Sequence, residues 1–180
     1  MDIYLRPLAL QDAPALLSLR TRNRDFFEPW EPTQSARHFT LTGQRDEIDR
    51  SLSDAKRDVR YAFGVFLTAN DELVGRVALS NVSRGAWQNA TLGYYIDEAH
   101  NHRGYATDAV KLALRFAFSS AGLHRVQAAV LSRNVASRRV LEKAGFTREG
   151  RSTKYLQING VWEDHEMFAV TAEDWDGLEP

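Results

Sequence analysis

The chain has 180 residues, of which 43% are hydrophobic and 26% are charged, and its formal net charge is -1. This length and composition predict one globular domain, spanning residues 1–180, with a core of its own. Because the chain has no cysteine, disulfides, thiolate metal ligands and a cysteine nucleophile are excluded. No apolar run is long enough for a membrane span, and the first residues lack the pattern of a signal peptide. We therefore expect a cytoplasmic protein without a membrane partner.

Charge is unevenly distributed along the chain. Residues 103–151 contain ten Lys or Arg and three Asp or Glu, whereas residues 152–180 contain one Lys and seven Asp or Glu. The first region suits a polyanionic ligand and the second suits a cationic partner. Two solvated faces of opposite sign would give the same pattern, so charge alone does not choose between these interpretations.

The first half of the chain mixes helical and strand-like patterns. Two prolines within residues 25–32, DFFEPWEP, oppose a regular helix and predict a loop rich in aromatic residues. The strands that follow are predicted to form an antiparallel meander. In chain order, hydrophobic spacing predicts a strand over residues 3–8, a helix over 10–22, a polar surface helix over 42–56, and strands over 61–68, 73–81 and 90–97.

Glycine and asparagine mark the ends of the elements in the second half. Gly104 opens a long helix, and the Asn159-Gly160 pair predicts a hairpin, because a type I′ turn needs positive φ at both central residues. The chain has no internal repeat or interdomain linker, so the order of elements predicts one α/β domain. The predicted elements are a helix over residues 104–121 ended by Gly122, a strand over 125–131, a helix over 134–144 with Asn134 as N-cap and Gly145 after it, and strands over 147–158 and 161–170.

Residues 100–108, HNHRGYATD, lie between a predicted strand and a predicted helix, where a fold can present backbone amides to a phosphate. The sequence contains neither a P-loop nor a dinucleotide-binding fingerprint. Residues 101–106, NHRGYA, instead resemble the Q/R-x-x-G-x-G/A loop of the GNAT N-acetyltransferases, whose amides hold the pyrophosphate of acetyl-CoA. Asn101 stands where that loop has Gln or Arg, and Arg103 could supply the missing charge. Taken alone, the glycine could equally serve helix–sheet packing.

A segment on the next predicted helix extends this resemblance. Residues 134–146, NVASRRVLEKAGF, resemble the N-x-x-S…L-x-x-x-G-F segment of the same family. The resemblance implies that Asn134 contacts the pantetheine arm. It also implies that Ser137 lies near the thiol, where it can protonate the leaving thiolate. Without the first motif, Asn134 would be only an N-cap and Ser137 an ordinary serine in the first turn.

Four further segments resemble the RimJ/RimL branch of the family, which acetylates the N-terminal amines of ribosomal proteins. They are residues 23–32, which end in PWEP, and residues 80–85, 92–96 and 155–165. The resemblance implies the α/β GNAT (acyl-CoA N-acyltransferase) fold, a mixed central sheet of about seven strands flanked by helices. It further implies acetyl-CoA as cosubstrate, no metal, and direct transfer of the acetyl group to a protein N-terminus in a ternary complex. The enzyme would make no direct contact with nucleic acid and would be a monomer or a homodimer.

The same resemblance assigns residues to a cofactor site and an acceptor site. Phe27, Trp30 and Glu31, together with Trp87, are expected to bind the acceptor, although each aromatic residue could instead serve the core or an interface. A backbone amide near Tyr95 or Ile96 is expected to stabilise the oxyanion. The expected cofactor-binding residues are Tyr95, Ile96, Asn101, His102, Arg103, Gly104, Tyr105, Ala106, Thr107, Asn134 and Ser137.

The general base is the least determined group of the expected mechanism. An α-amine has a pKa of about 8, so a modest base acting directly or through water is enough. Lys154 and Thr91 stand where RimL-like relatives carry acidic residues, which leaves Asp164, His165 and Glu31 as candidates. His165 has the most suitable ordinary pKa, and Asp164 has the closer family resemblance.

Two other functions stay open from the sequence. A small-amine acetyltransferase, acting on a polyamine or an aminoglycoside-like molecule, would share the cofactor motifs, because a fold does not fix its acceptor. A CoA-binding or ribosome-assembly factor without turnover would be consistent with the departures at Asn101, Thr91 and Lys154.

Overall fold

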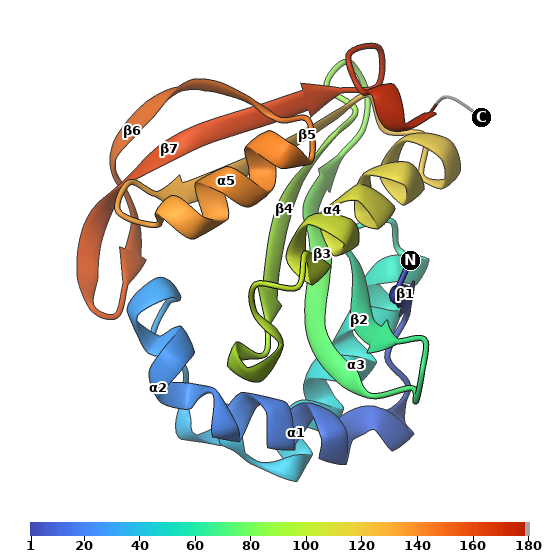
Figure 1. The fold of residues 1–180 in the computed structure, drawn as a ribbon, viewed down its shortest axis with the longest axis vertical. Helices are drawn as coiled ribbons and strands as arrows, with labels where there is room; N and C mark the ends of the chain where they lie inside the picture. Colours follow the sequence, from blue (N-terminus) through green and yellow to red (C-terminus); the bar gives the residue numbers. More distant parts are fainter. Residues whose placement is uncertain (179–180) are drawn as a thin grey trace.

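A computed structural model describes residues 1–178 of the chain. Its centre is a seven-stranded sheet with the strand order β1-β2-β3-β4-β5-β7-β6 (Figure 1). Neighbouring strands are antiparallel, except that β4 and β5 run parallel. The sheet is therefore mixed, with the number of strands that the family resemblance implied.

The predicted strands and long helices are all present. Within residues 1–178, every helix is too short or too polar to cross a bilayer. The strands are β1 (Ile3–Arg6), β2 (Tyr61–Leu67), β3 (Leu73–Ser83), β4 (Asn89–Ile96), β5 (Arg125–Leu131), β6 (Thr147–Ile158) and β7 (Val161–Thr171). The helices are α1 (Ala13–Arg22), α2 (Arg24–Phe27), α3 (Leu41–Lys56), α4 (Tyr105–Arg115) and α5 (Val135–Lys143).

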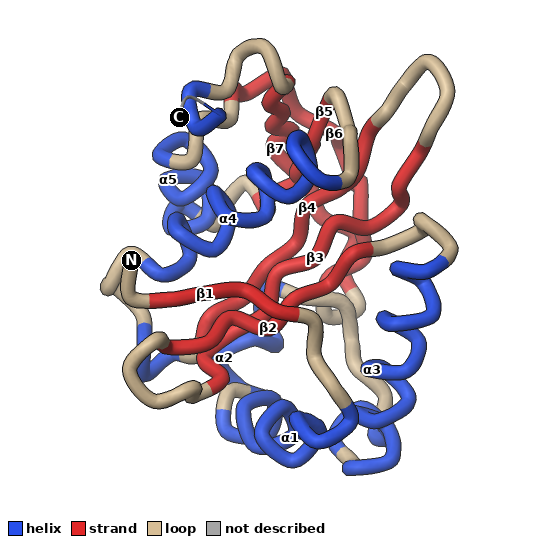
Figure 2. The backbone as a smooth tube through the Cα atoms, turned by 90° about the vertical axis from the view of Figure 1, so that its right-hand side faces the viewer, coloured by secondary structure: helices blue, strands red, loops and turns tan. Residues whose placement is uncertain are grey.

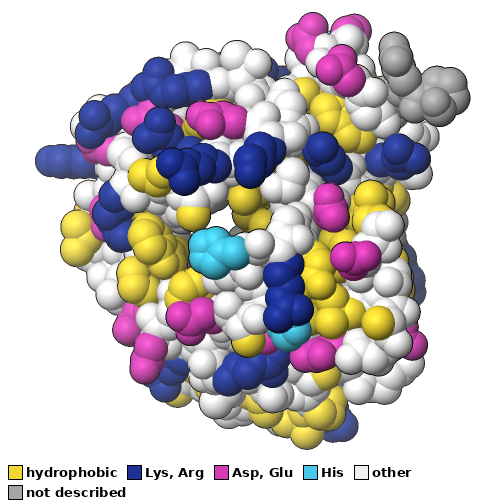
Figure 3. All heavy atoms as spheres, viewed as in Figure 1, with side chains coloured by type: hydrophobic (Ala, Val, Ile, Leu, Met, Phe, Trp, Pro, Cys, Tyr) yellow, Lys and Arg dark blue, Asp and Glu magenta, His cyan; other side chains and the backbone are white. Residues whose placement is uncertain are grey.

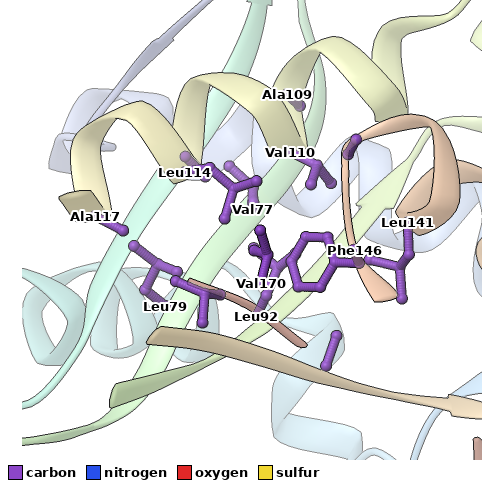
Figure 4. Close-up of a cluster of buried hydrophobic side chains, with 14 of the residues drawn as sticks. Val77, Leu79, Leu92, Ala109, Val110, Leu114, Ala117, Leu141, Phe146 and Val170 are labelled. Carbon is purple, nitrogen blue, oxygen red and sulfur yellow. The ribbon is translucent and has the colours of Figure 1, made fainter. Parts of the chain in front are cut away.

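Helices cover both faces of the sheet, with α4 and α5 on one face and α1 and α3 on the other (Figure 2). On the first face, Val110 and Leu114 of α4 point toward Val77 of β3 within the main cluster of buried side chains (Figure 4). A second cluster, which includes Leu16 of α1 and Ile48 of α3, attaches those helices to the opposite face. Burial of each such aliphatic side chain contributes about 1.5–3 kcal/mol, so both helical layers are held by their apolar faces.

The loop predicted over residues 25–32 is wrong in its first part, which is helical. Helix α2 covers Arg24–Phe27, and a 3-10 turn follows over Glu28–Trp30. Pro29 lies in the first turn of that segment, where the N–H that proline lacks is not needed. The chain becomes extended only at Glu31, whose φ is -131 and ψ is 161, because the next proline disfavours a helical residue before it.

Two predicted helices are also shorter in their regular part than the sequence pattern suggests. The helix predicted from residue 10 begins at Ala13, after a 3-10 turn, with Pro14 in its first turn. The helix predicted to residue 121 is α-helical only to Arg115 and continues as a π-helical turn over Phe116–Ser120. Gly122, with φ +62, then reverses the chain as expected.

Strands β4 and β5 pair over a short length and then part. Their register partners are Asn89↔Arg125, Ala90↔Val126 and Thr91↔Gln127. Beyond these pairs β4 continues to Ile96 and β5 to Leu131 without further pairing to each other in the described chain. Because the two strands lie in the middle of the sheet, their divergence opens a wedge-shaped gap, here called the split, between its two halves.

Candidate active site

The segment that joins β4 to α4 presents free amide groups beside the split. The first residue of α4 follows Gly104, which caps the helix with φ +84. The first hydrogen bond of the helix runs from the Asp108 amide to the Gly104 carbonyl at 3.0 Å, so the earlier amides have no partner within the helix. His102 also has a left-handed φ of +62, a conformation that non-glycine residues adopt mostly where surrounding structure requires it. The loop is thus shaped to direct amides at an anion.

Asp97 fixes this loop to helix α1. Its carboxylate accepts hydrogen bonds from Arg22 Nη2 at 2.7 Å and Asn23 Nδ2 at 2.9 Å, and it lies 3.1 Å from His100 Nδ1. Burial alone would raise the pKa of Asp97, but the hydrogen bonds from Arg22, Asn23 and His100 outweigh it and lower the pKa to about 2. The loop therefore starts from a charged, buried anchor.

A cavity of about 540 Å³ lies between this loop and α5. Figure 3 shows a hollow near the centre of this face, with Lys and Arg side chains along its upper edge and a histidine below it. The cavity therefore offers amides, apolar walls and cationic groups to one elongated ligand. Its lining residues are Phe26, Trp30, Ile96, His100, Asn101, His102, Gly104, Tyr105, Ala106, Thr107, Asn134, Ala136, Arg139, Val140 and Lys143.

Asn134 and Ser137 lie together at the start of α5, next to β4. The Oδ1 atom of Asn134 accepts the Ser137 amide at 3.0 Å, so Asn134 is an N-cap as well as a lining residue of the cavity. The Tyr94 hydroxyl lies 2.7 Å from Ser137 Oγ, and burial raises the pKa of Tyr94 to about 12. Tyr94 therefore keeps its proton at neutral pH and can donate it to Ser137.

The alternation of β4 decides which amides face the split. The Asp97 amide donates to the Val74 carbonyl of the neighbouring segment at 2.8 Å, which places it on the β3 side. Amides of successive residues point to opposite edges of a strand, so the Ile96 amide faces the split and the Tyr95 amide faces β3. Of the two expected oxyanion donors, Ile96 has the backbone orientation that the role requires.

A second pocket, of about 390 Å³, lies on the opposite face of β4 and is here called the arginine-lined pocket. Tyr95 forms part of it, and Arg20 stacks on the rings of Tyr95 and Phe27 at 4.9 Å from each centroid. Glu31 lines the pocket and is paired with Arg20. Gly93 lies beside Tyr95 on the central strand and is exposed, with open space where a side chain would be. An acceptor can therefore approach β4 from this face. The lining residues are Arg20, Glu31, Gln34, Ser35, Arg37, His38, Gly43, Asp46, Glu47, Arg50, Arg76 and Tyr95.

The 3-10 turn and the residues that follow it close the open end of the split. Arg133, which follows β5, lies over the Trp30 ring at 4.8 Å and donates to the Pro29 carbonyl at 2.6 Å. The Asn159 amide at the tip of the β6–β7 hairpin donates to the Glu31 carbonyl at 3.1 Å. Of the residues expected to bind the acceptor, Trp30 lines the cavity on the α5 face, and Phe27 is 5% exposed within the second cluster of buried side chains. Neither lines the arginine-lined pocket, whereas Glu31 does.

Trp87 lies away from these residues. It precedes β4, whose other end, at Ile96, borders the cavity. A strand rises about 3.3 Å per residue, so the length of β4 separates Trp87 from the cavity by roughly 23 Å. The structure does not bring Trp87 together with the other expected site residues.

The three candidate bases lie in different environments. The Lys154 amide, at 2.8 Å, and Arg151, at 2.5 Å, hold the pKa of Asp164 below its ordinary value, so this carboxylate is a weak base. Asp164 also shares the sheet face of Phe168, toward α5, by alternation along β7. His165 faces the other way but is 2% exposed, and its Nδ1 lies 2.9 Å from the Glu163 carbonyl. Glu31 alone among the three lines the arginine-lined pocket.

No pattern in the sequence predicts the cationic part of this pocket. Arg20, Arg76, His38 and Glu47 come from four separate segments, so no local motif joins them. One signal was present: Arg20 follows Leu16 by four residues and therefore falls on the apolar face of α1. An arginine at such a position is buried with a partner, and Arg20 is 2% exposed.

Comparison with known proteins connects this arrangement to one family. The model of the Acetyltransferase (GNAT) domain matches residues 2–147. The chain belongs to the GNAT acetyltransferase family. The α/β GNAT fold expected from the sequence is confirmed, and the chain is an acetyl-CoA-dependent N-acyltransferase.

Relatives of this GNAT enzyme match it over nearly its whole length. The probable N-acetyltransferase YjcK of Bacillus subtilis (strain 168) is 45% identical over 172 residues, covering 96% of this chain and 95% of the relative. The ribosomal protein uS5-alanine N-acetyltransferase of Escherichia coli (strain K12) is 32% identical, covering 92% of this chain and 85% of the relative. The structure of Mycobacterium smegmatis RimJ in complex with CoA-disulfide has a TM-score of 0.90 at 32% identity, covering 95% of this chain and 82% of that chain. The enzyme is therefore a RimJ-like member of the family.

Replacement of the anchor below the cofactor loop is expected to destabilise this GNAT enzyme. Asp97→Asn should lower the free energy of unfolding at pH 7 by about 2 kcal/mol, because the folded-state pKa of Asp97 is about 2 against an ordinary 3.8. A depressed carboxyl pKa stabilises the fold above the ordinary value, and this stabilisation is lost as the pH falls toward the folded-state value. Urea unfolding of wild type and Asp97→Asn should thus show a difference in free energy of unfolding that falls, at pH 3, to about half of its value at pH 7. Asp49→Asn, at an exposed site on α3, should change stability by less than about 0.5 kcal/mol. Equal stability of Asp97→Asn and wild type at pH 7 would contradict the anchor role.

Proposed function

We propose that this enzyme transfers the acetyl group of acetyl-CoA to the N-terminal α-amine of a protein, such as a ribosomal protein, in a ternary complex. The observation that carries the proposal is the placement of two pockets on opposite faces of β4 beside the split. An acyl donor on the α5 face and an amine on the α1 face could meet there without a covalent enzyme intermediate. The relatives named for ribosomal proteins support a protein N-terminus as the acceptor.

Acetyl-CoA would bind along the cavity between the loop and α5. The amides at the start of α4, from Gly104 to Thr107, would hold the pyrophosphate, with Arg139 and Lys143 adding positive charge. The free amide nitrogen of Asn134 would contact the pantetheine arm. The thioester carbonyl would then lie near the Ile96 amide, which stabilises the oxyanion formed when the amine attacks.

The leaving thiolate would take its proton from Ser137. Tyr94 lies 2.7 Å from Ser137 Oγ and remains protonated at neutral pH, because its pKa is raised to about 12. When Tyr94 donates to Ser137 Oγ, the serine proton is free to point toward the sulfur. Ser137 would give its proton to the thiolate and take the proton of Tyr94, and Tyr94 would regain a proton from water, since its raised pKa favours the neutral phenol.

The amine would lose its proton to Glu31, directly or through water in the arginine-lined pocket. Glu31 lines that pocket. Asp164 faces α5, and His165 is buried, with its Nδ1 atom next to the Glu163 carbonyl of the same strand. An α-amine with a pKa of about 8 needs only a modest base, which a carboxylate beside solvent provides. A polyamine acceptor fits less well, because four arginines line the pocket and would repel a second positive charge.

Incubation with acetyl-CoA and peptides carrying a free α-amine tests the proposed function. We expect one acetyl group on the N-terminal nitrogen, located by fragmentation in mass spectrometry. Peptides with a blocked N-terminus and an internal lysine should remain unmodified, since a lysine amine has a pKa near 10.4 and is more fully protonated. Modification of polyamines or aminoglycosides alone would refute the proposal.

Ser137→Ala should separate turnover from cofactor binding. Loss of the thiolate acid is expected to lower kcat roughly 100-fold, whereas the Kd for acetyl-CoA should change by less than about twofold. A thiol-release assay gives kcat and calorimetry gives Kd. Ser53→Ala, at an exposed position on α3, is the matched control and should behave as wild type. Wild-type turnover in Ser137→Ala would remove this residue from the mechanism.

Gly104→Ala should weaken acetyl-CoA binding by about tenfold, which corresponds to about 1.4 kcal/mol. The added methyl group would lie where the ligand approaches the loop amides. Gly85→Ala is the matched control, because Gly85 and Gly104 both have left-handed φ values, +69 and +84, with open space around them. Both variants should be destabilised by a similar amount in thermal unfolding, but only Gly104→Ala should lose affinity in calorimetry. Equal affinity in the two variants would contradict pyrophosphate binding at this loop.

A further inference from the structure

The arginine-lined pocket carries more positive than negative charge. Its lining includes four arginines, Arg20, Arg37, Arg50 and Arg76, and three acids, Glu31, Asp46 and Glu47. Each acid already has an arginine partner: Glu31 pairs with Arg20, Asp46 with Arg37, and Glu47 with Arg50 and Arg76. One positive charge is therefore left over within the lining.

Glu47 shows where this excess is concentrated. Its carboxylate lies 2.9 Å from Arg76, 3.0 Å from Arg60 and 3.6 Å from Arg50. Arg60 is also paired with Asp54, at 3.2 Å, so within the pocket Glu47 is the one carboxylate that Arg50 and Arg76 share. Burial alone would raise the pKa of Glu47, but Arg76 and Arg60 outweigh it and lower the pKa. The buried Nε atoms of Arg20 and Arg76 have no hydrogen-bond partner among residues 1–178, whereas Arg60 Nε lies 3.2 Å from the Asp54 carboxylate. Two guanidinium donors, one each on Arg20 and Arg76, therefore remain unused beside the carboxylates of the pocket.

The pKa of His38, which also lines the pocket, is affected by the same arginines. Burial lowers its pKa most, and the charges of Arg20 and Arg76 lower it further, to about 4, against the opposing effect of Glu47. The ring is therefore neutral at neutral pH, and its buried Nε2 has no partner in the described chain. A group that is neutral and unpartnered adds no charge to the pocket but leaves one more polar atom for a ligand.

The cationic cluster lies beside the strand at which transfer would occur. Arg76 of β3 is the register partner of Tyr95 of β4, and the Tyr95 ring contacts Arg20. Glu31, paired with Arg20, lies in the same pocket. An acceptor could thus place its ammonium group near Glu31 and a group of opposite charge near Arg50 and Arg76.

We propose that the arginine-lined pocket binds a carboxylate carried by the acceptor, close to its reacting amine. This inference rests on the proposed function, since it names the acceptor of the same site. Guanidinium groups bind carboxylates through paired, charge-assisted hydrogen bonds, and the single excess charge of the lining matches one carboxylate. The carboxylate comes either from an acidic side chain near a protein N-terminus or from the α-carboxylate of a free amino acid.

Matched peptides test this inference. Peptides begin with alanine and carry glutamate at the second, third or fourth position, each paired with the corresponding glutamine peptide, and free glutamate is the small-molecule probe. The kcat/KM with acetyl-CoA is measured for each, together with its Kd for the CoA-bound protein by calorimetry. For at least one position, we expect the glutamate peptide to exceed its glutamine partner by about tenfold in both quantities.

Arginine variants show whether the preference for glutamate over glutamine peptides arises in the arginine-lined pocket. Arg76→Gln should abolish it, and Arg50→Gln should reduce it; because Arg50 is 67% exposed, that variant should fold even if Arg76→Gln does not. Arg45→Gln is the matched control, an exposed arginine on the same helix outside the pocket, and should retain the full preference.

Each outcome decides between the two proposals. Equal values for all glutamate and glutamine peptides, or a preference unchanged in both pocket variants, would overturn the carboxylate site. Binding of the acidic peptide without acetylation would support the site and refute the proposed function. Tighter binding and faster acetylation of free glutamate than of any peptide would support the site and show that a small amine, not a protein, is the acceptor.

Discussion

The parting of β4 and β5 is the constraint on which the rest of this structure depends. Two parallel strands that pair only from Asn89 to Thr91 leave an opening in the middle of an otherwise continuous sheet. Such an opening leaves backbone amides that a closed sheet would use internally. Arg133 and the tip of the β6–β7 hairpin fasten the segment from Pro29 to Glu31 across its open end. In the proposed function, a thioester on one face meets an amine on the other through this opening.

The two faces of the split differ in how they obtain their charge. On the α5 face, positive character comes from backbone amides at the start of α4 and from partly exposed side chains, which suits a ligand that enters from solvent. On the α1 face, Arg20 and Arg76 are largely buried, Arg20 beside two aromatic rings, whereas Arg37 and Arg50 are exposed. These four arginines face three carboxylates. Buried cations keep their strength because little water screens them. All residues that line the arginine-lined pocket precede residues 100–108 and the Asn134–Ser137 segment in the chain.

Local patterns in the sequence predicted the structure correctly where a turn or a helix start is formed by one short segment. The Asn159-Gly160 turn has φ values of +44 and +81, as a type I′ turn requires, and Gly104 has the left-handed φ that a close approach of backbone to ligand needs. Local signals failed where distant segments decide the outcome. The two prolines predicted a loop over residues 25–32, but Pro29 is compatible with the first turn of a 3-10 helix, and only Pro32 is preceded by extended backbone. The contact between Phe27 and Tyr95, from distant segments, could not be read from the sequence. The carboxylate of Asp164 accepts a hydrogen bond from the Lys154 amide, which lies at an irregularity in the pairing of β6 with β7. The sequence does not predict the position of that irregularity.

By itself, the sequence determined the order of strands and helices, the loop that opens α4 and the Asn134–Ser137 segment, since each depends on residues close together in the chain. It also determined the family, because those segments follow one another at characteristic spacing. Only the tertiary structure decided which residues share a pocket. Arg20, His38, Glu47 and Arg76 come from α1, a 3-10 turn, α3 and β3, and no local pattern records that they meet. The charge and burial of the arginine-lined pocket arise only when these segments pack together, so no single motif in the sequence predicts them.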